Sequence, residues 1–378
     1  MSTVAQTPAR AVPFMDLSAQ HENLKAEILA DLADLIDSNT FTNGPQVAEF
    51  EEAFAAFCGA RFAVGVANGL DAIRLALIAA GIEPGDEVIV PANTFVATLE
   101  AVVQARGRPV VVDASERDYN VDVAASAASV TPKTRFIVPV HLYGQLADMR
   151  PLLRLARGAE LTIVEDACQA HGASRDGIRA GTAGVAGAFS FYPGKNLGAF
   201  GDAGAVVTDN RALADAVRSL RHHGERRKYE HEVEGYTSRL DTVQALVLLH
   251  KLPHLARWNE ERRSLAGLYN AALSGVGDLR LPPVPDGSEP VWHLYPIRTG
   301  ERAALSAFLS ARGIGSGRHY PTPVHLTPAY AWLGHRRGEF PVAEGLADEL
   351  LSLPIFPGMG EVDVAAVTGA IVDFFRRG

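Results

Sequence analysis

One lysine, Lys195, lies between an aromatic, apolar run and a glycine-rich loop. The segment reads GAFSFYPGKNLGAFGDAGAVVTD over residues 187–209, and its glycines allow tight turns and a close approach of the backbone to a ligand. The flanking runs 187–192 and 204–208 are typical of buried strands. A lysine between buried strands loses solvation, which lowers its pKa and favours the neutral amine that forms Schiff bases. The alternative is a lysine whose charged end reaches solvent from a loop.

A carboxylate, Asp166, ends another apolar run at residues 161–164 and is followed by Ala-Cys-Gln-Ala-His-Gly. Such a group could ligate a metal, cap a helix or pair with a ring nitrogen of a bound cofactor. Glu165, Asp166 and His171 form no metal-ligand pattern with another cluster, so we expect no metal site. The choice between a helix cap and a cofactor partner stays open at this point.

The turn after the short apolar run 62–66 is a third candidate. Asn68 precedes the helical pattern LDAIRLALIAAG at residues 70–81. A strand, a turn and a helix in this order present free backbone N–H groups to an anion. The alternative is an ordinary junction in which Asn68 is only the helix N-cap.

Strands and helices that alternate along the chain would position these residues. Helical patterns cover residues 20–37, 45–58, 70–81, 93–105 and 151–156, and strand patterns cover 62–66, 87–90, 110–112, 136–140, 161–164, 187–192 and 204–208. This alternation predicts an α/β fold with a mostly parallel, doubly wound sheet, whose ligands bind beyond the carboxyl ends of the strands. The candidates at such ends, expected to form one site, are Asn68, Phe95, His141, Asp166 and Lys195.

The rest of the chain predicts a second, smaller unit. We expect a large domain at residues 1–250, with a loose N-terminal arm at 1–12, and a small C-terminal α/β domain at 251–378. The helical patterns of the latter part are 240–252, 254–273, 302–312, 342–351 and 362–375. A segment rich in proline and aromatic residues, 315–330, is expected to loop over the site.

Composition limits the classes of function. The chain has 378 residues, 47% of them hydrophobic and 21% charged, which is typical of a soluble globular protein. Its net charge of -9 and the lack of a basic block argue against a nucleic-acid partner. The two cysteines, Cys58 and Cys168, have no metal-ligand spacing and favour a reducing cytoplasm. We see no signal core and no apolar run that would span a bilayer, so no membrane is expected.

Eight segments together resemble one family. They are FTNGPQVAEFEEAFA (41–55), VANGLDAIRLAL (66–77), GDEVIVPANTFVAT (85–98), PVHLYGQLADM (139–149), VEDACQAHGA (164–173), GAFSFYPGKNLGAFGDAGAVVT (187–208), SRLDTVQA (238–245) and HYPTPVH (319–325). In this order they resemble the DegT/StrS family of pyridoxal-phosphate-dependent sugar aminotransferases, which have the aspartate-aminotransferase-like fold type I. The segment ANGLDAIRLAL resembles the corresponding segment of the subgroup that acts on 3-keto-6-deoxy sugars linked to dTDP.

The resemblance implies a role for each matching position. Lys195 would hold pyridoxal 5'-phosphate as a Schiff base and carry the proton between substrate and cofactor, and Asp166 would pair with the pyridine nitrogen. Gln169 would bond to the phenolic oxygen of the ring, and Phe95 would stack on its face. The amides of Leu70 and Asp71, together with Ser190, would hold the phosphate, with the Asp71 carboxylate turned away from it.

The remaining candidates concern the cofactor phosphate and the sugar nucleotide. Relatives often have Asn where this chain has Thr237. That asparagine reaches the phosphate from a neighbouring subunit, and the threonine side chain is shorter. Either the Thr237 hydroxyl or Arg239 would have to serve, although Arg239 could instead pair with Asp241. Candidate contacts to the sugar nucleotide are Tyr320, His325 and the pair His222-His223, with His223 preferred, although solvated histidines are the simpler interpretation of that pair.

The activity that the resemblance implies is amino transfer from glutamate to a nucleotide-linked keto sugar, in a ping-pong sequence and in a homodimer with shared sites. The alternatives are a 4-keto sugar or keto-inositol aminotransferase, a sugar dehydratase, and a non-catalytic or regulatory protein on the same fold. Some relatives that act as dehydratases have histidine at the lysine position, so Lys195 favours transamination. A GxGxxG loop after the first strand, which a dehydrogenase would need, is absent.

Overall fold

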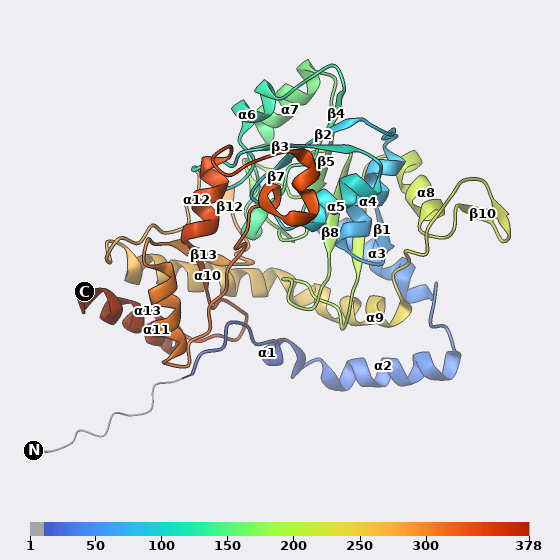
Figure 1. Cartoon of the computed structure of the whole chain (residues 1–378). Coiled ribbons are helices and arrows are strands. Elements are labelled where there is room, and N and C mark those ends of the chain that lie inside the picture. Colours follow the sequence, from blue (N-terminus) through green and yellow to red (C-terminus); the bar gives the residue numbers. More distant parts are fainter. Residues whose placement is uncertain (1–10, 378) are drawn as a thin grey trace, which may run out of the picture.

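The computed structural model describes residues 11–377 and is built around a seven-stranded sheet (Figure 1). The strand order is β1-β9-β8-β5-β4-β2-β3. β9 runs antiparallel to both of its neighbours, and the other pairs are parallel. The prediction of a mostly parallel α/β sheet is therefore confirmed. The strands are β1 (Phe62–Val66), β2 (Glu87–Pro91), β3 (Arg108–Val112), β4 (Thr134–Ile137), β5 (Thr162–Asp166), β8 (Ala186–Ser190) and β9 (Gly204–Thr208).

Helices cover both faces of this sheet. Alternate residues of a strand point to opposite faces, so Val64 of β1 packs in one hydrophobic cluster and Ala63 packs in the other. The first cluster takes in α4 (Gly69–Ala79), α5 (Ala97–Gln104) and α8 (Arg211–Leu220). The second takes in α3 (Pro45–Cys58), α7 (Met149–Gly158) and α9 (Thr242–Lys251), while α6 (Val123–Ala128) precedes β4.

Several predicted boundaries were wrong. The helix expected at 20–37 is two helices, α1 (Ser18–His21) and α2 (Lys25–Ser38). Leu24, in the turn between them, packs with Leu246 and Trp258. The helix expected at 93–105 begins only at Ala97. Asn93 is instead buried and donates from Nδ2 to the Tyr119 carbonyl at 2.9 Å. The strand expected at 136–140 is β4, which ends at Ile137.

The C-terminal part has its own core. The long helix α10 (Leu255–Leu273) leads to the antiparallel pair β13 (Tyr295–Arg298) and β14 (Leu350–Leu353). These elements pack with α11 (Arg302–Ser310) and α13 (Glu361–Arg376), and Val12 joins the same cluster. The expected helix at 342–351 is α12 (Pro341–Glu349), because residues 350 and 351 belong to β14. Leu346 of α12 packs with the main sheet, so the division at residue 250 stays a prediction.

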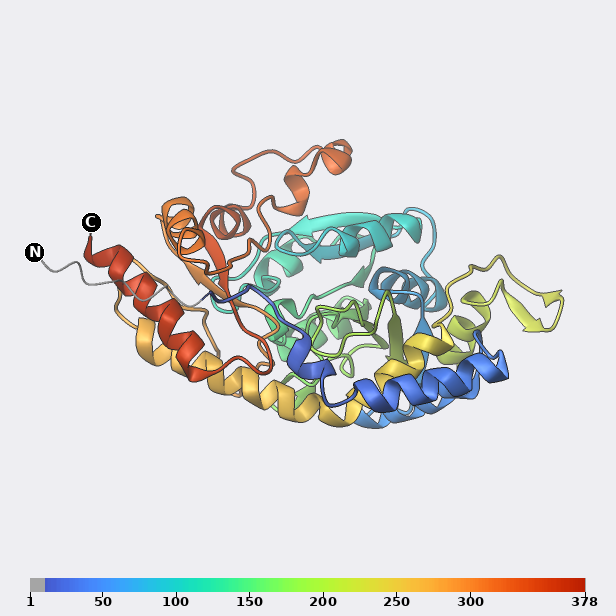
Figure 2. The same cartoon turned by 90° about the horizontal axis from the view of Figure 1, so that it is seen from below.

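Smaller elements lie at the edges. Figure 2 shows α2, α9 and α10 along one side of the molecule, with a hairpin projecting beyond α8. The hairpin is β10 (Glu225–Arg227) and β11 (Glu230–His231), and a small sheet contains β6 (Ser174–Arg175), β7 (Ile178–Arg179) and β12 (Ser288–Glu289). The 3-10 helices are η1 (Leu142–Gly144), η2 (Leu252–His254), η3 (Val324–Leu326) and η4 (Pro328–Leu333). Within residues 11–377, no helix has the length and apolar character needed to cross a membrane.

Candidate active site

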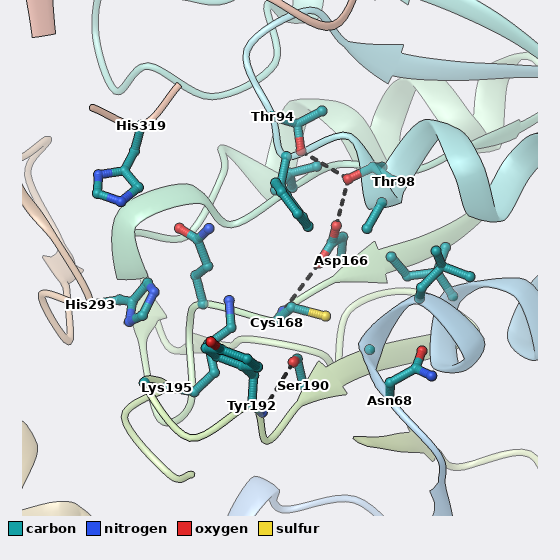
Figure 3. A pocket seen from close by; sticks show the side chains of 18 of the residues that line it. Asn68, Thr94, Thr98, Asp166, Cys168, Ser190, Tyr192, Lys195, His293 and His319 are labelled. Carbon is teal, nitrogen blue, oxygen red and sulfur yellow. Dashed lines mark hydrogen bonds between the residues drawn. The ribbon is translucent and has the colours of Figure 1, made fainter. Parts of the chain in front are cut away.

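A cavity of about 640 Å³ lies beyond the carboxyl ends of the parallel strands. Figure 3 shows side chains from strand ends and loops pointing into it. Of the residues predicted to form one site, those that line the cavity are Asn68, Leu70, Asp71, Phe95, Asp166, Gln169, Ser190, Lys195 and Tyr320. The fold thus brings together residues that lie up to 252 positions apart, from Asn68 to Tyr320.

Lys195 follows β8 in a tight loop and enters the cavity (Figure 3). Its backbone N–H donates to the Tyr192 carbonyl at 2.8 Å. A Cβ at Gly198 would lie 2.2 Å from the Pro193 carbonyl oxygen, so the loop closes only with glycine there. Burial lowers the pKa of the Lys195 ammonium, while Cys168 and Asp166 oppose this shift. The lysine is therefore a partly buried amine, as the sequence predicted.

Asp166 ends β5 with both carboxylate oxygens held by the protein. Thr98 Oγ1 donates to Asp166 Oδ2 at 2.8 Å, and the Cys168 N–H donates to Oδ1 at 3.2 Å. Since the Thr98 hydroxyl proton goes to Asp166, Thr94 Oγ1 must be the donor in the 2.8 Å bond between the two threonines. No helix begins directly after Asp166, so it is not a helix N-cap in this structure. Within residues 11–377, no group of three or more His, Cys, Asp or Glu side chains is placed to hold a metal ion.

The N-terminus of α4 forms the opposite corner of the cavity. Asn68 is the N-cap, and its Oδ1 accepts from the Asp71 N–H at 2.8 Å. The Asp71 amide is therefore already bonded, and the Gly69 and Leu70 amides belong to the first turn, which has no intrahelical acceptors. A Cβ at Gly69 would lie 2.6 Å from Ser190 Cβ, so glycine allows the helix end to approach Ser190.

The Asp71 carboxylate is engaged by other side chains. Its Oδ2 accepts from Ser238 Oγ at 2.6 Å, and its Oδ1 lies 2.7 Å from Arg74 Nη2. These partners fix the side chain and partly neutralise its charge. They support the expectation that this carboxylate does not oppose an anion at the helix end.

Gln169 and two aromatic residues form one wall of the cavity. Gln169 Oε1 accepts from the Tyr143 N–H at 2.8 Å, and its Nε2 donates to the Tyr320 hydroxyl at 3.1 Å. The rings of Phe95 and Tyr320 are 5.3 Å apart at 36°. Phe95 lines the cavity and is 50% exposed, so its ring is accessible to a planar ligand.

His325 is placed differently from the prediction. Its side chain is fully buried in η3, outside the cavity lining. Nε2 lies 3.2 Å from Glu344 Oε1, and the ring packs edge-on against Phe340 at 4.7 Å. The chain after Tyr320 turns toward α12 instead of continuing along the site, so the expected substrate contact of His325 is wrong for this arrangement.

The cluster around Arg239 also lies outside the cavity lining of its own chain. Arg239 Nη1 donates to His222 Nδ1 at 2.9 Å, and Thr237 Oγ1 lies 3.3 Å from His223 Nε2. The bonds recorded for Arg239 go to these histidines and not to Asp241.

His141, the remaining residue expected at the strand ends, forms a separate buried pair with Glu165. His141 Nε2 lies 2.8 Å from Glu165 Oε2 below the site, with both side chains fully buried. His141 is thus a structural residue in this chain.

Several lining residues were missed from the sequence. They are Thr94, Thr98, Cys168, Tyr192, His293 and His319. Thr94 and Thr98 lie four residues apart near the start of the helix predicted at 93–105, and this spacing could have indicated a polar pair facing one way. The segment around His293 carries no such signal.

The donor set of this cavity fits pyridoxal 5'-phosphate. An amine, Lys195, suits an aldehyde, and a carboxylate that is already held in place, Asp166, suits a pyridine nitrogen. The start of α4, together with Ser190, suits a phosphate, because first-turn amides and the helix dipole favour an anion.

Comparisons with known proteins agree with this chemistry. The family model described as the DegT/DnrJ/EryC1/StrS aminotransferase family matches residues 22–372. The dTDP-3-amino-3,4,6-trideoxy-alpha-D-glucose transaminase of Streptomyces venezuelae is 47% identical over 377 residues, 100% of this chain and 99% of the relative.

Solved structures are similar over nearly the whole chain. S. venezuelae DesV in complex with a ketimine intermediate superimposes with a TM-score of 0.95 at 47% identity, covering 98% of this chain and 100% of that one. NtdA from Bacillus subtilis with bound cofactor PMP has a TM-score of 0.91 at 30% identity, covering 99% and 87%.

Proposed function

Because the chain belongs to the DegT/DnrJ/EryC1/StrS aminotransferase family, we propose that it transfers an amino group from glutamate to a nucleotide-linked keto sugar. The protein is a pyridoxal-phosphate-dependent sugar aminotransferase with the fold type I architecture. The observation that carries the proposal is the meeting of Lys195, Asp166 and the α4 N-terminus in one cavity.

Bound pyridoxal 5'-phosphate supplies an aldehyde that condenses with amines and a protonated ring that withdraws electrons from the reacting carbon. Lys195 Nζ would be the covalent anchor in the resting enzyme and, once released, the base that removes and returns a proton at the substrate carbon. Its lowered pKa supplies the neutral amine that both tasks need. The Asp166 carboxylate, held by Thr98 and Cys168, would keep the ring nitrogen protonated.

The other cofactor contacts follow from their positions. The Leu70 amide and Ser190 would hold the phosphate, while the Asp71 amide would have to leave Asn68 Oδ1 to take part. Gln169 Nε2 would donate to the phenolic oxygen in place of the Tyr320 hydroxyl, and Phe95 would cover one ring face. Arg239 and Thr237 remain proposed contacts to the cofactor phosphate. They would reach it across the interface, from one chain into the cavity of its partner.

We propose a dTDP-linked 3-keto-6-deoxy sugar as the acceptor. The support is the ANGLDAIRLAL segment and the 47% identity with the S. venezuelae transaminase, whose name specifies a dTDP-linked 3-amino sugar. Tyr320, which lies in the cavity, and His223, from a second copy of the chain, remain candidate substrate contacts. His325 is removed from that set.

We further propose a homodimer that works in the cytoplasm. Of the Lys and Arg side chains in residues 11–377, Lys195 alone lines the cavity, beside Asp71, Glu100, Asp166 and Asp202. Further cations would stabilise the phosphates of a cofactor and a nucleotide, and we propose that a second copy supplies them. Both cysteines are free, which is consistent with a reducing compartment. A monomer with full activity at high dilution would contradict the dimer.

The test is a coupled assay of 2-oxoglutarate release from glutamate with a panel of 3-keto and 4-keto sugars, each linked to dTDP or UDP, and a keto-inositol. The proposal predicts the highest kcat/KM with a dTDP-linked 3-keto-6-deoxy sugar. Preference for a 4-keto sugar or keto-inositol would replace the substrate assignment. Loss of a sugar hydroxyl without glutamate turnover would show a dehydratase instead.

A further inference from the structure

His293 is a nearly buried imidazole in the wall of the cavity, and no role has been assigned to it above. It is 8% exposed, comes from the segment before β13, and points into the same cavity as Lys195 (Figure 3). Its Nδ1 lies 3.2 Å from Oδ1 of Asn196, the residue next to Lys195. Within residues 11–377, Nε2 makes no hydrogen bond.

The surrounding hydrogen bonds determine which nitrogen carries the proton. Asn196 Nδ2 donates both of its hydrogens, to the Val291 carbonyl at 2.8 Å and to Asn259 Oδ1 at 2.9 Å. Asn259 is oriented in turn, because its Nδ2 donates to the His171 carbonyl at 2.8 Å. Asn196 therefore presents only its oxygen to His293, and His293 Nδ1 must be the donor. The lone pair of the neutral ring is then on Nε2, and the residue lines the cavity.

The ring stays neutral in its surroundings. Burial is the largest cause that lowers the pKa of His293 well below its usual value. The nearby cations Lys195 and Arg262, and then His319 and His171, add to that effect. A neutral imidazole of this kind is a weak base for proton transfer but remains a hydrogen-bond acceptor across the working pH range.

We infer that His293 Nε2 accepts a hydrogen bond from a hydroxyl of the keto sugar, on a ring carbon next to the carbonyl that reacts beside Lys195. The inference rests on the proposed function and adds a specificity-determining residue to it. A lone pair in this place repels the carboxylates of an amino acid and attracts the O–H of a sugar. His293 would therefore act on the second substrate of the ping-pong sequence and not on the first.

The test compares steady-state kinetics of the holoenzyme with His293→Leu and His293→Gln, using the accepted keto sugar and its analogue that lacks the adjacent hydroxyl. We expect His293→Leu to raise the KM for the sugar roughly 10-fold, the size of one lost hydrogen bond, and to leave the KM for glutamate unchanged. His293→Gln, whose side-chain oxygen can accept, should lose less. The deoxy analogue should be a weaker substrate for the wild type and should show no further loss in His293→Leu.

The matched control is His250→Gln on α9, whose ring pairs with Asp31 Oδ2 at 2.7 Å, away from the cavity lining. An unchanged sugar KM in both His293 variants would overturn the inference, as would an equal loss with the sugar and its deoxy analogue. A matching rise in the KM for glutamate would also overturn it. If the wild type transfers no amino group to any sugar, the proposed function fails first.

A readout that does not depend on turnover is ¹⁵N NMR of the histidine rings in the cofactor-free protein, with His293 assigned from its absence in His293→Gln. The structure predicts a protonated Nδ1 and an unprotonated Nε2 at neutral pH and still at pH 6.5, where an ordinary histidine is half protonated. A proton on Nε2, or an imidazolium at neutral pH, would contradict the inference.

Discussion

The two halves of the active-site cavity are built by different means. One half, here called the strand-end half, consists of Asn68, Asp166, Ser190 and Lys195, which end or follow strands of the central sheet. The other, the loop half, consists of His293, His319 and Tyr320, which come from irregular segments of the C-terminal part.

The strand-end half is positioned by backbone pairing. β5 and β8 are in parallel register, with Asp166 opposite Ala188, and β8 pairs with β9, with Ser190 opposite Gly204. The loop half is positioned by individual hydrogen bonds, such as the one from the Tyr143 hydroxyl to the His319 carbonyl at 2.6 Å. Chemistry common to an aminotransferase family can therefore reside in the sheet, while substrate preference can change in loops without disturbing it.

The largest effect is expected from Lys195→Ala in the strand-end half. This change should abolish turnover, because the amine that anchors the cofactor and moves the proton is lost. Circular dichroism and the thermal midpoint should match the wild type, since Lys195 bonds the fold through its backbone. More than a few per cent of wild-type kcat in a correctly folded variant would refute the role of the strand-end half.

Asp166→Asn should lower kcat by roughly 100-fold or more, the size typical of losing a charged partner of the reacting group. Cofactor occupancy, measured by absorbance after dialysis, should fall much less, because the remaining contacts still hold the cofactor. A variant whose rate equals that of the wild type would show that Asp166 is only structural.

Thr98→Val should lower kcat by roughly 10-fold, since a hydrogen bond to a charged group contributes about 1.5–3 kcal/mol. The buried Thr98 hydroxyl donates to Asp166, and valine keeps the shape but removes the donor. Thr98→Ser retains the hydroxyl and is the matched control. Equal rates in the valine and serine variants would show that the bond does not tune Asp166.

His325→Leu, in the segment that leads away from the loop half, should affect stability and not catalysis. The bond between His325 and Glu344 is buried, so its loss should lower the free energy of unfolding by about 1–3 kcal/mol. His335→Leu, at the more exposed pair with Glu339, is the control and should cost less. A rise in the KM for the sugar, with unchanged stability, would restore His325 as a substrate contact.

The smallest effect concerns pH. Burial lowers the pKa of His319 to about 4, with Lys195 adding to the shift. The unfolded chain therefore takes up this proton first, near pH 6.5, so the stability contribution is complete above that pH and declines as the pH falls toward 4. Urea unfolding at pH 7 and pH 4.5 should show a smaller pH-dependent loss in His319→Gln than in the wild type. Identical losses would contradict this assignment.

The sequence was a good guide where local patterns decide the structure. The alternation of apolar residues located every strand of the central sheet, and Asn68 before a helical pattern identified the α4 N-cap. It follows that the positions of Asp166 and Lys195 beyond strand ends could be predicted, because the carboxyl ends of parallel strands share one edge.

The loop half could not be predicted in the same way. Tyr320 and His325 lie in one proline-rich segment, yet one enters the cavity and the other packs against α12. His293 was missed because its orientation depends on Asn196 and Asn259, which are distant in sequence. Thr98 was missed because its partner, Asp166, lies 68 residues away. Such contacts have no local signature.

The most direct test of the central claim is borohydride reduction of the enzyme loaded with pyridoxal 5'-phosphate, followed by peptide mass spectrometry. The account predicts one reduced adduct, on the peptide that contains Lys195, together with loss of the visible absorbance. An adduct on another lysine, or none in protein that has retained its cofactor, would contradict the claim that this partly buried amine, with Asp166 beside it, is the catalytic centre.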